Sequence, residues 1–273
     1  MPHDFDGREL APGFALPPED SRSTAVASIA VDEDRRVWIV DTAARRVRAF
    51  TAFGRELDGL PRGVGDRVGS FEDVIAVDAT GVEETAQLAI ASSGPRRHAL
   101  HVARADARAA VSLRARDTAL GFAGLGRVAF GPRGLVLACE PKSRLVLAWR
   151  EGQFHFAFRV PGEGEPVAAR ALRDGRLVVA AAGLDGGAVH LFDGAGRLVR
   201  TLVHAGVDEG FVSDPEDLAL DEAAGSDRRT RLVVADSSGA RLQVFNLEGE
   251  CYGVFGTERG PDLETDERSA ESS

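Results

Sequence analysis

The chain has 273 residues, of which 44% are hydrophobic and 28% are charged, and its formal net charge is −10. This composition is ordinary for a globular protein, and the length is sufficient for one large all-β domain. An acidic surface repels the phosphates of nucleic acids, so sequence-independent binding to DNA or RNA is disfavoured.

Two further features of the sequence bear on the cellular compartment of the protein. The N-terminal residues MPHDFDGRELAPGF lack the apolar core of a secretory signal peptide, and no apolar run approaches the roughly 20 residues of a membrane helix. The two cysteines, Cys139 and Cys251, are far apart and lie in apolar runs, so neither a disulfide framework nor a zinc site is indicated. We therefore expect a cytoplasmic protein with reduced, buried thiols and no membrane insertion.

The first 22 residues precede the first apolar run. Within them, FDGRELAPGF resembles AFGRELDGL at residues 52–60, which has the composition of a turn between a third and a fourth strand. Residues 1–22 are therefore a candidate closing strand, or an extra strand, for the domain that follows.

The first repeat unit begins near residue 25, in the stretch ASIAVDEDRRVWIVD. Two apolar runs lead to Asp41, Phe50 follows nine positions later, and Gly54 follows four positions after that. Apolar runs of about four to eight residues, rich in Val, Leu and Ile and separated by Asp, Gly and Arg, predict short strands joined by turns.

The same unit recurs further along the chain, beginning near residues 72, 126, 166 and 216. The spacing of nine recurs from Glu140 to Trp149, from Gly183 to Phe192 and from Asp236 to Phe245. The unit near residue 72 is the exception, because SSGPRRHALHVAR has neither the acid nor the aromatic residue. In the last unit the pattern predicts strands at 217–221, 231–235, 240–246 and 250–255.

Four short strands in a repeat of roughly 40–50 residues are typical of a β-propeller blade. A blade buries both of its faces only when other blades stack beside it, which explains runs such as LVLACE that are apolar on both faces. We therefore predict an all-β propeller of five four-stranded blades at residues 23–256, with almost no helix. The tail at 257–273 is polar and acidic and is predicted to be disordered.

The repeated residues have structural explanations within a blade. Asp41, Glu140 and Asp236 would end the second strand and accept hydrogen bonds from turn amides, or pair with the arginine that opens the third strand, Arg46 or Arg241. Phe50, Trp149, Phe192 and Phe245 would fill the space between blades, and Gly54, Gly196 and Gly249 would adopt positive φ in the next turn. Asp32, Asp78 and Asp221 follow the first strand and are interpreted as turn residues. The alternative is a ring of carboxylates that binds a metal or forms an acid–base pair.

At this level of detail, two of the units resemble NHL repeats. The resemblance rests on PEDLALD followed by LVVADSSGARLQVF, and on ASIAVDEDRRVWIVDTAARRVRAF, and it weakens in the middle of the chain. The asparagine typical of the turn after the second strand is replaced by Ala44, Pro95 and Gly239. Because the resemblance implies a propeller that usually has six blades, six blades are the alternative to the five counted.

Propellers related to the NHL repeat include metal-dependent lactonases and lyases, whose sites are not matched here. The lactonase-like site uses asparagines, and the only asparagine of this chain, Asn246, falls in an outer turn. The lyase-like site needs converging histidines, whereas His101, His155 and His190 fall in third and fourth strands of different blades. Neither a nucleophile elbow nor a phosphate loop is present. We therefore predict no catalytic residue, no metal ligand and no cofactor.

The connections between strands remain as the candidate functional surface. The residues singled out there are Arg62, Arg67, Arg96, Arg97, His98, Asp208, Glu209 and Phe211. Basic and acidic groups on one surface favour a protein partner over a nucleic acid, and solvated loops without a partner are the alternative. The first hypothesis is a non-catalytic interaction or scaffold module. The second is a diverged propeller hydrolase or lyase with an axial site, the third is RNA binding, and the oligomeric state stays open.

Overall fold

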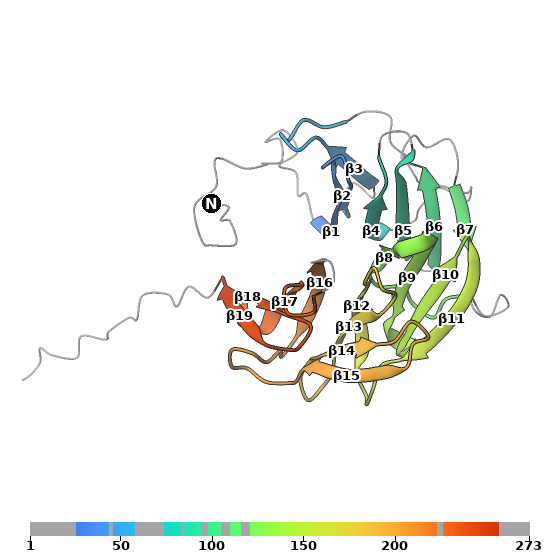
Figure 1. Cartoon of the computed structure of the whole chain (residues 1–273). Coiled ribbons are helices and arrows are strands. Elements are labelled where there is room, and N and C mark those ends of the chain that lie inside the picture. Colours follow the sequence, from blue (N-terminus) through green and yellow to red (C-terminus); the bar gives the residue numbers. More distant parts are fainter. Residues whose placement is uncertain are drawn as a thin grey trace, which may run out of the picture.

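The computed structural model describes residues 26–43, 46–57, 74–82, 85–93, 98–104, 110–115, 121–222 and 226–256. These residues form five antiparallel sheets, and in each sheet the strands are hydrogen-bonded in sequence order. Figure 1 shows the sheets arranged around a common centre, with the first strand of each sheet innermost. The predicted five-bladed β-propeller is therefore confirmed.

The five sheets are numbered here as blades 1 to 5 in chain order. Blade 1 comprises β1 (Val26–Val31), β2 (Val37–Asp41) and β3 (Arg46–Phe50), and blade 2 comprises β4 (Val74–Thr80), β5 (Gln87–Ser93), β6 (His98–Arg104) and β7 (Ala110–Leu113). Blade 3 comprises β8 (Val128–Gly131), β9 (Leu135–Glu140), β10 (Leu145–Arg150) and β11 (Gln153–Arg159). Blade 4 comprises β12 (Glu165–Ala171), β13 (Leu177–Ala182), β14 (Ala188–Phe192) and β15 (Leu198–Val203). Blade 5 comprises β16 (Pro215–Asp221), β17 (Arg231–Asp236), β18 (Arg241–Phe245) and β19 (Cys251–Phe255).

Blade 1 has the beginning of a fourth strand. The amide of Leu57 donates to the carbonyl of Ala49 at 2.8 Å, and Phe50 forms an antiparallel bridge with Glu56. Residues 58–73 lie outside the described part of the chain, as do the N-terminal segment 1–22 and the tail 257–273.

Helical structure is limited to single turns. The described ranges include 3-10 turns at Pro132–Gly134, Pro141–Ser143 and Ser237–Gly239, and the predicted near-absence of helix is confirmed. Within the same ranges, no helix has the length and apolar character required to cross a membrane.

Four apolar cores join neighbouring blades. Because successive side chains of a strand point to opposite faces, blades 2, 3 and 4 each contribute to two of these cores, and blades 1 and 5 contribute to one each. Among the buried residues of these cores are Trp38 and Val77 between blades 1 and 2, Leu100 and Trp149 between blades 2 and 3, Leu137 and Phe192 between blades 3 and 4, and Val178 and Phe245 between blades 4 and 5. Burial of each such large side chain contributes about 1.5–3 kcal/mol.

No comparable core of described residues joins blade 5 to blade 1, and we call the region between these two blades the seam. In Figure 1 their ribbons stand apart, whereas the other blades follow one another closely. Apolar side chains are exposed on both sides of the seam, namely Ile29 at 59% and Val31 at 56% on β1, and Leu242 at 46% on β18. The described residues therefore form an apolar core at four junctions and no such core at the fifth.

The third-strand aromatic residues lie on the side of each blade that faces the preceding blade. Trp149, Phe192 and Phe245 belong to the cores between blades 2 and 3, 3 and 4, and 4 and 5, respectively. Phe50 occupies the same position in blade 1, where the preceding neighbour would be blade 5 across the seam. Glycine is required in the turn after β18, since Gly249 has φ of 90° and a Cβ atom there would lie 2.3 Å from the carbonyl oxygen of Leu202.

Candidate partner-binding face

Two kinds of connection meet on one side of the ring, which we call the loop face. It carries the turns between second and third strands and the connections from each fourth strand to the next blade. The amide of Ala123, which precedes β8, donates to Glu140 Oε1 at 2.8 Å. In blade 5 the amide of Asp214 donates to Asp236 Oδ1 at 2.8 Å in the same way.

These hydrogen bonds give the repeated acids a structural role. Asp41, Glu140 and Asp236 are the last residues of β2, β9 and β17, and all three are buried. The guanidinium of Arg241 donates to Asp236 Oδ2 through Nε at 3.1 Å and through Nη2 at 3.0 Å. A carboxylate with this many donors fixes the two connections that contact it, because buried polar groups require partners.

The connection at 204–214 is the best-defined part of the loop face. The amide of Gly210 donates to Gln243 Oε1 at 3.0 Å, and Gln243 Nε2 donates to the carbonyl of Phe211. Arg241 Nη2 donates to the carbonyls of Asp208 and Phe211 at 3.3 and 3.2 Å. Gln243 and the side chain of Arg241 are themselves buried. The backbone of this loop is therefore fixed by hydrogen bonds from two side chains of β18, Arg241 and Gln243.

The fixed loop presents apolar and acidic side chains to solvent. Phe211 is 43% exposed and Val207 is 74% exposed. Asp208 and Glu209 lie between them in the sequence and are exposed as well. An exposed aromatic residue within an acidic surface is suited to a partner that offers an apolar recess with basic groups around it.

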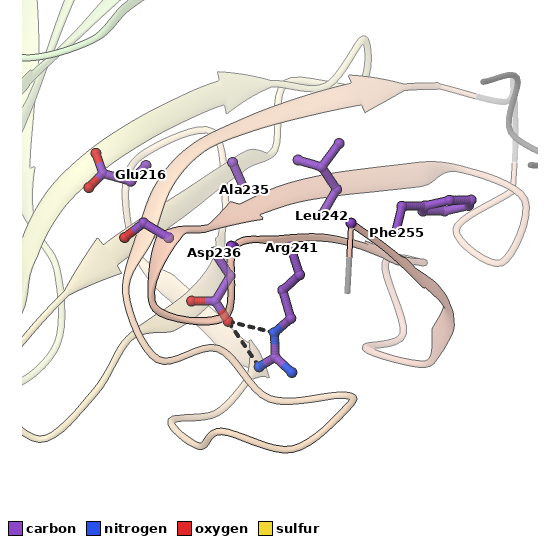
Figure 2. A pocket seen from close by; sticks show the side chains of 9 residues that line it. Glu216, Ala235, Asp236, Arg241, Leu242 and Phe255 are labelled. Carbon is purple, nitrogen blue, oxygen red and sulfur yellow. Dashed lines mark hydrogen bonds and ion pairs between the residues drawn. The ribbon is translucent and has the colours of Figure 1, made fainter. Parts of the chain in front are cut away.

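A pocket of about 270 Å³ lies on blade 5. It is lined by Glu216, Ala235, Asp236, Ser237, Ala240, Arg241, Leu242, Phe255 and Gly256. Figure 2 shows Ala235, Leu242 and Phe255 along the sheet, beside the pair formed by Asp236 and Arg241. The pocket therefore combines an apolar wall with one ion pair that is already satisfied.

The structure brings together only part of the predicted partner-binding set. Asp208, Glu209 and Phe211 share the loop over blade 5. His98 begins β6 in blade 2, where its Nδ1 lies 2.9 Å from Ser93 Oγ, so it belongs to a different blade of the same face. The four predicted arginines, Arg62, Arg67, Arg96 and Arg97, lie outside the described residues.

A second group of charged residues, not anticipated from the sequence, lies at the centre of the ring. We call Asp78, Arg127, Arg170 and Asp217 the axial cluster; Asp78, Arg170 and Asp217 lie in the innermost strands β4, β12 and β16, and Arg127 directly precedes β8. Asp217 lies 3.3 Å from Arg127 Nε and 3.4 Å from Arg170 Nη2. Arg127 Nη1 also donates to the carbonyl of Ala27 in blade 1, so this arginine of blade 3 contacts both blades that border the seam.

The interpretation of Asp78 as a turn residue is wrong. It lies inside β4 and accepts a hydrogen bond from the amide of Phe130 in blade 3 at 2.6 Å. Burial raises the pKa of the Asp78 carboxyl above the ordinary value of an aspartate, and the nearby Arg170 partly opposes that rise. By contrast, Asp32 does form the predicted turn, because its Oδ1 accepts the amides of Asp34 and Arg36 at 3.1 and 2.9 Å.

The histidines lie in the strands expected for them. His101 is in β6, His155 in β11 and His190 in β14, which belong to different blades. Burial, together with the nearby His204, lowers the pKa of His190 to about 4. In the part of the chain that the structure describes, no three His, Cys, Asp or Glu side chains are grouped so that they could hold a metal ion.

Comparison with known proteins supports the fold. No family model and no curated protein matches the chain. Among solved structures, the chain is similar to a nidogen/laminin complex (TM-score 0.62, 15% identity, 85% of this chain and 80% of the other). It is also similar to a streptogramin B lyase (TM-score 0.58, 12% identity, 89% of this chain and 70% of the other). A gluconolactonase from Xanthomonas campestris is similar as well (TM-score 0.53, 16% identity, 84% of this chain and 71% of the other). At these identities the similarity shows a β-propeller fold alone, and the neighbours include enzymes as well as binding proteins.

Proposed function

We propose that the chain is a non-catalytic, NHL-like β-propeller that acts as a cytoplasmic interaction module and binds a protein partner through its loop face. The observation that carries this proposal is the loop at 204–214, whose backbone is fixed by Gln243 and Arg241 while Phe211 and its acidic neighbours remain exposed.

A fixed loop is favourable for binding because little conformational entropy is lost when the partner docks. The aromatic side chain of Phe211 belongs to a class of residues that is enriched in the buried core of protein interfaces. The surrounding acids and the net charge of −10 favour a basic partner over an acidic one.

Affinity capture with variants of the full chain tests this proposal. We expect Phe211→Ser to lose a partner that the unsubstituted protein retains, because the anchor is removed while the loop's backbone contacts remain. The matched control is Phe53→Ser, since Phe53 is 98% exposed in the turn between β3 and the start of the fourth strand, on the opposite face of the ring. Equal retention by the two variants would contradict the proposal.

A second candidate function rests on the axial cluster. A buried carboxyl with a raised pKa beside arginines is an arrangement found in catalytic sites as well as in structural ion-pair networks. Under this alternative the protein is a diverged propeller enzyme acting on a lactone or ester. Turnover of a lactone and ester panel that is lost in Asp78→Asn and kept in Asp221→Asn would favour it, because Asp221 is exposed at the end of β16.

A further inference from the structure

A pocket of about 50 Å³ lies between blades 3 and 4, on the side of the ring opposite the loop face. We call this side the turn face, because it carries the turns that join first to second strands and third to fourth strands. Leu135, Phe156 and Leu177 form an apolar wall of the pocket, and they belong to or pack against the core shared by the two blades, which are neighbours in Figure 1. The pocket is therefore the turn-face end of a packed junction.

Three arginines line the same pocket. Arg133 lies in the turn between β8 and β9, Arg150 is the last residue of β10, and Arg173 lies in the turn between β12 and β13. Arg150 points toward blade 4, because it is directly opposite Leu135 of the shared core and follows Trp149, which faces blade 2. Arginines from two blades therefore border one small cavity.

The charges of these arginines are largely unpaired. In the part of the chain that the structure describes, neither Arg133 nor Arg150 forms an ion pair or a side-chain hydrogen bond. Arg173 Nε lies 3.9 Å from Glu222 Oε2, which is a long distance for an ion pair. Guanidinium groups that are not paired with carboxylates of the protein can donate to an external anion.

An acid also borders the pocket, but it is already paired. Asp174 Oδ1 accepts a hydrogen bond from the amide of Arg176 at 2.9 Å, and Asp174 Oδ2 accepts one from Arg176 Nε at 2.7 Å. The remaining nitrogens of the Arg176 guanidinium donate to Asp227 at 2.8 and 2.6 Å. The pocket thus keeps an excess of positive charge in a chain whose formal net charge is −10.

Arg150 occupies a position at which three other blades have a different kind of residue. Directly after the third-strand aromatic residue, blades 1, 4 and 5 have Thr51, Asp193 and Asn246. Each of these side chains accepts hydrogen bonds from amides of the following turn at 2.9–3.2 Å. Arginine occurs at the equivalent position in blade 2, as Arg104, and in blade 3. Because arginine cannot accept a hydrogen bond, blade 3 lacks this contact and has a cation at the pocket instead.

We propose that this pocket binds the phosphate group of a small phosphorylated molecule. A volume of about 50 Å³ is well below the roughly 300–1,000 Å³ of sites that enclose a whole ligand, so it fits one group of the ligand. A phosphate monoester carries a charge of about −1.5 to −2 at pH 7 and has three acceptor oxygens, which matches several arginines better than a planar carboxylate does.

The apolar wall contributes to the choice of ligand. Phe156 is half-buried at the pocket, where it would contact the organic part of a phosphate ester. The inference does not depend on the proposed partner binding, because the pocket lies on the turn face and the loop at 204–214 lies on the opposite side of the ring.

Titration of the full chain with phenyl phosphate at constant ionic strength tests the proposal, with isothermal calorimetry as the measurement. We expect saturable binding of one ligand per chain. Arg150→Met should weaken it by about tenfold, because a charge-assisted contact is lost while the aliphatic stem is kept. Arg133→Asn should have a similar effect, and asparagine tolerates the φ of 59° at this position.

The matched control is Arg229→Met. Arg229 is an exposed arginine in the connection between β16 and β17, so this variant removes the same charge from the turn face of blade 5. It should change the affinity by less than about twofold. Far-UV circular dichroism verifies that all variants are folded.

Several outcomes would overturn the proposal. Equal weakening in Arg229→Met would show that only net charge matters, and an absence of saturable binding by the unsubstituted protein would show that no such site exists. Affinity for benzoate equal to that for phenyl phosphate would show that the pocket does not select phosphate. Displacement of phenyl phosphate by a lower concentration of oligouridylate would identify a nucleic acid backbone as the ligand.

A second test locates the site without substitutions. Phenylglyoxal modifies accessible guanidinium groups, and mass spectrometry of the digested protein gives the rate at each arginine. Phenyl phosphate should slow the modification of Arg133 and Arg150 and leave the rate at Arg229 unchanged. Equal protection at all three positions, or protection at none of them, would also overturn the proposal.

Discussion

The junction between blades 4 and 5 and the seam between blades 5 and 1 place equivalent residues in different surroundings. At the junction, Phe245 packs in an apolar core with Val178 and Leu232. On the blade 1 side of the seam, the guanidinium of Arg48 lies 5.0 Å from the centre of the Phe50 ring. The same guanidinium donates to Glu56 through Nε at 2.9 Å and through Nη2 at 2.7 Å.

The difference shows how one repeat position can support two kinds of contact. Arg48 pairs with Ile39 in blade 1 as Gln243 pairs with Val234 in blade 5, so the two polar residues occupy equivalent places. Gln243 fixes the neighbouring loop, whereas Arg48 covers the aromatic residue of its own blade and reaches Asp41 at 3.5 Å. Apolar packing joins the blades at four junctions, whereas the polar contacts of Arg48 lie within blade 1.

The largest expected effect comes from removing an aromatic residue of a packed junction. Phe245→Ala should lower the free energy of unfolding by about 3–5 kcal/mol, because it leaves a cavity in the core between blades 4 and 5. Phe53→Ala is the matched control and should change stability by less than about 0.5 kcal/mol, since its ring is exposed. Urea denaturation measures both, and similar losses would contradict the assignment of Phe245 to the core.

Substitution of Arg48 tests how much its polar contacts in blade 1 contribute to stability. Arg48→Met should destabilise the protein by about 3 kcal/mol, because Asp41 is left as a buried carboxylate without this partner. Arg197→Met is the control, as the exposed pair of Arg197 with Asp193 contributes little. A variant as stable as the unsubstituted protein would show that apolar packing can replace the Arg48 contacts.

Lowering the pH should reduce the free energy of unfolding through protonation of His190 in β14. Its pKa is lowered to about 4, whereas an imidazole in the unfolded chain titrates near 6.5. The unfolded state therefore binds more protons between about pH 6.5 and pH 4, and stability falls as the pH is lowered through that window. His190→Gln should remove a pH dependence on the order of 2 kcal/mol.

Urea midpoints measured from pH 7.5 to pH 4 provide the comparison for His190. The control is His155→Gln, which alters an exposed histidine of β11 and should leave the profile unchanged. Superimposable profiles for the unsubstituted protein and His190→Gln would show that His190 is not held neutral.

The smallest effect is expected at the seam itself. Ile29→Ala should cost less than about 0.5–1 kcal/mol, because Ile29 is already 59% exposed. The same substitution at Ile90, which is fully buried between blades 1 and 2, should cost about 2–4 kcal/mol. Comparable losses in thermal denaturation at the two positions would show that the seam is packed like the other junctions.

The architecture was predictable because it is repeated locally. The nine-residue spacing from Asp236 to Phe245 locates one hairpin, and the strands of the last blade begin and end within two residues of the predicted positions. Blade 2 lacks both the acid and the aromatic residue, and its apolar runs alone were sufficient to place its strands near residue 72.

The axial cluster could not be predicted in the same way. Asp78, Arg127, Arg170 and Asp217 are far apart in sequence, and they meet only because the blades curve around one centre. A usable signal was the position of Asp78 within a run of β-forming residues, which is unusual for a turn. Similarly, Asp208, Glu209 and Phe211 are neighbours in sequence and could be grouped, whereas the support that Gln243 gives them depends on the folded loop.

In the described residues, apolar cores join four pairs of blades and none joins blades 5 and 1, and this arrangement has a consequence for cooperativity. A ring with identical contacts throughout has no ends, but here the blades form a linear array in which each is coupled to its nearest neighbours. Among the described residues, blades 1 and 5 each share an apolar core with one neighbouring blade, and we expect them to fray first. Blade 3, from Val128 to Arg159, has packed neighbours on both sides and should exchange its amide hydrogens last.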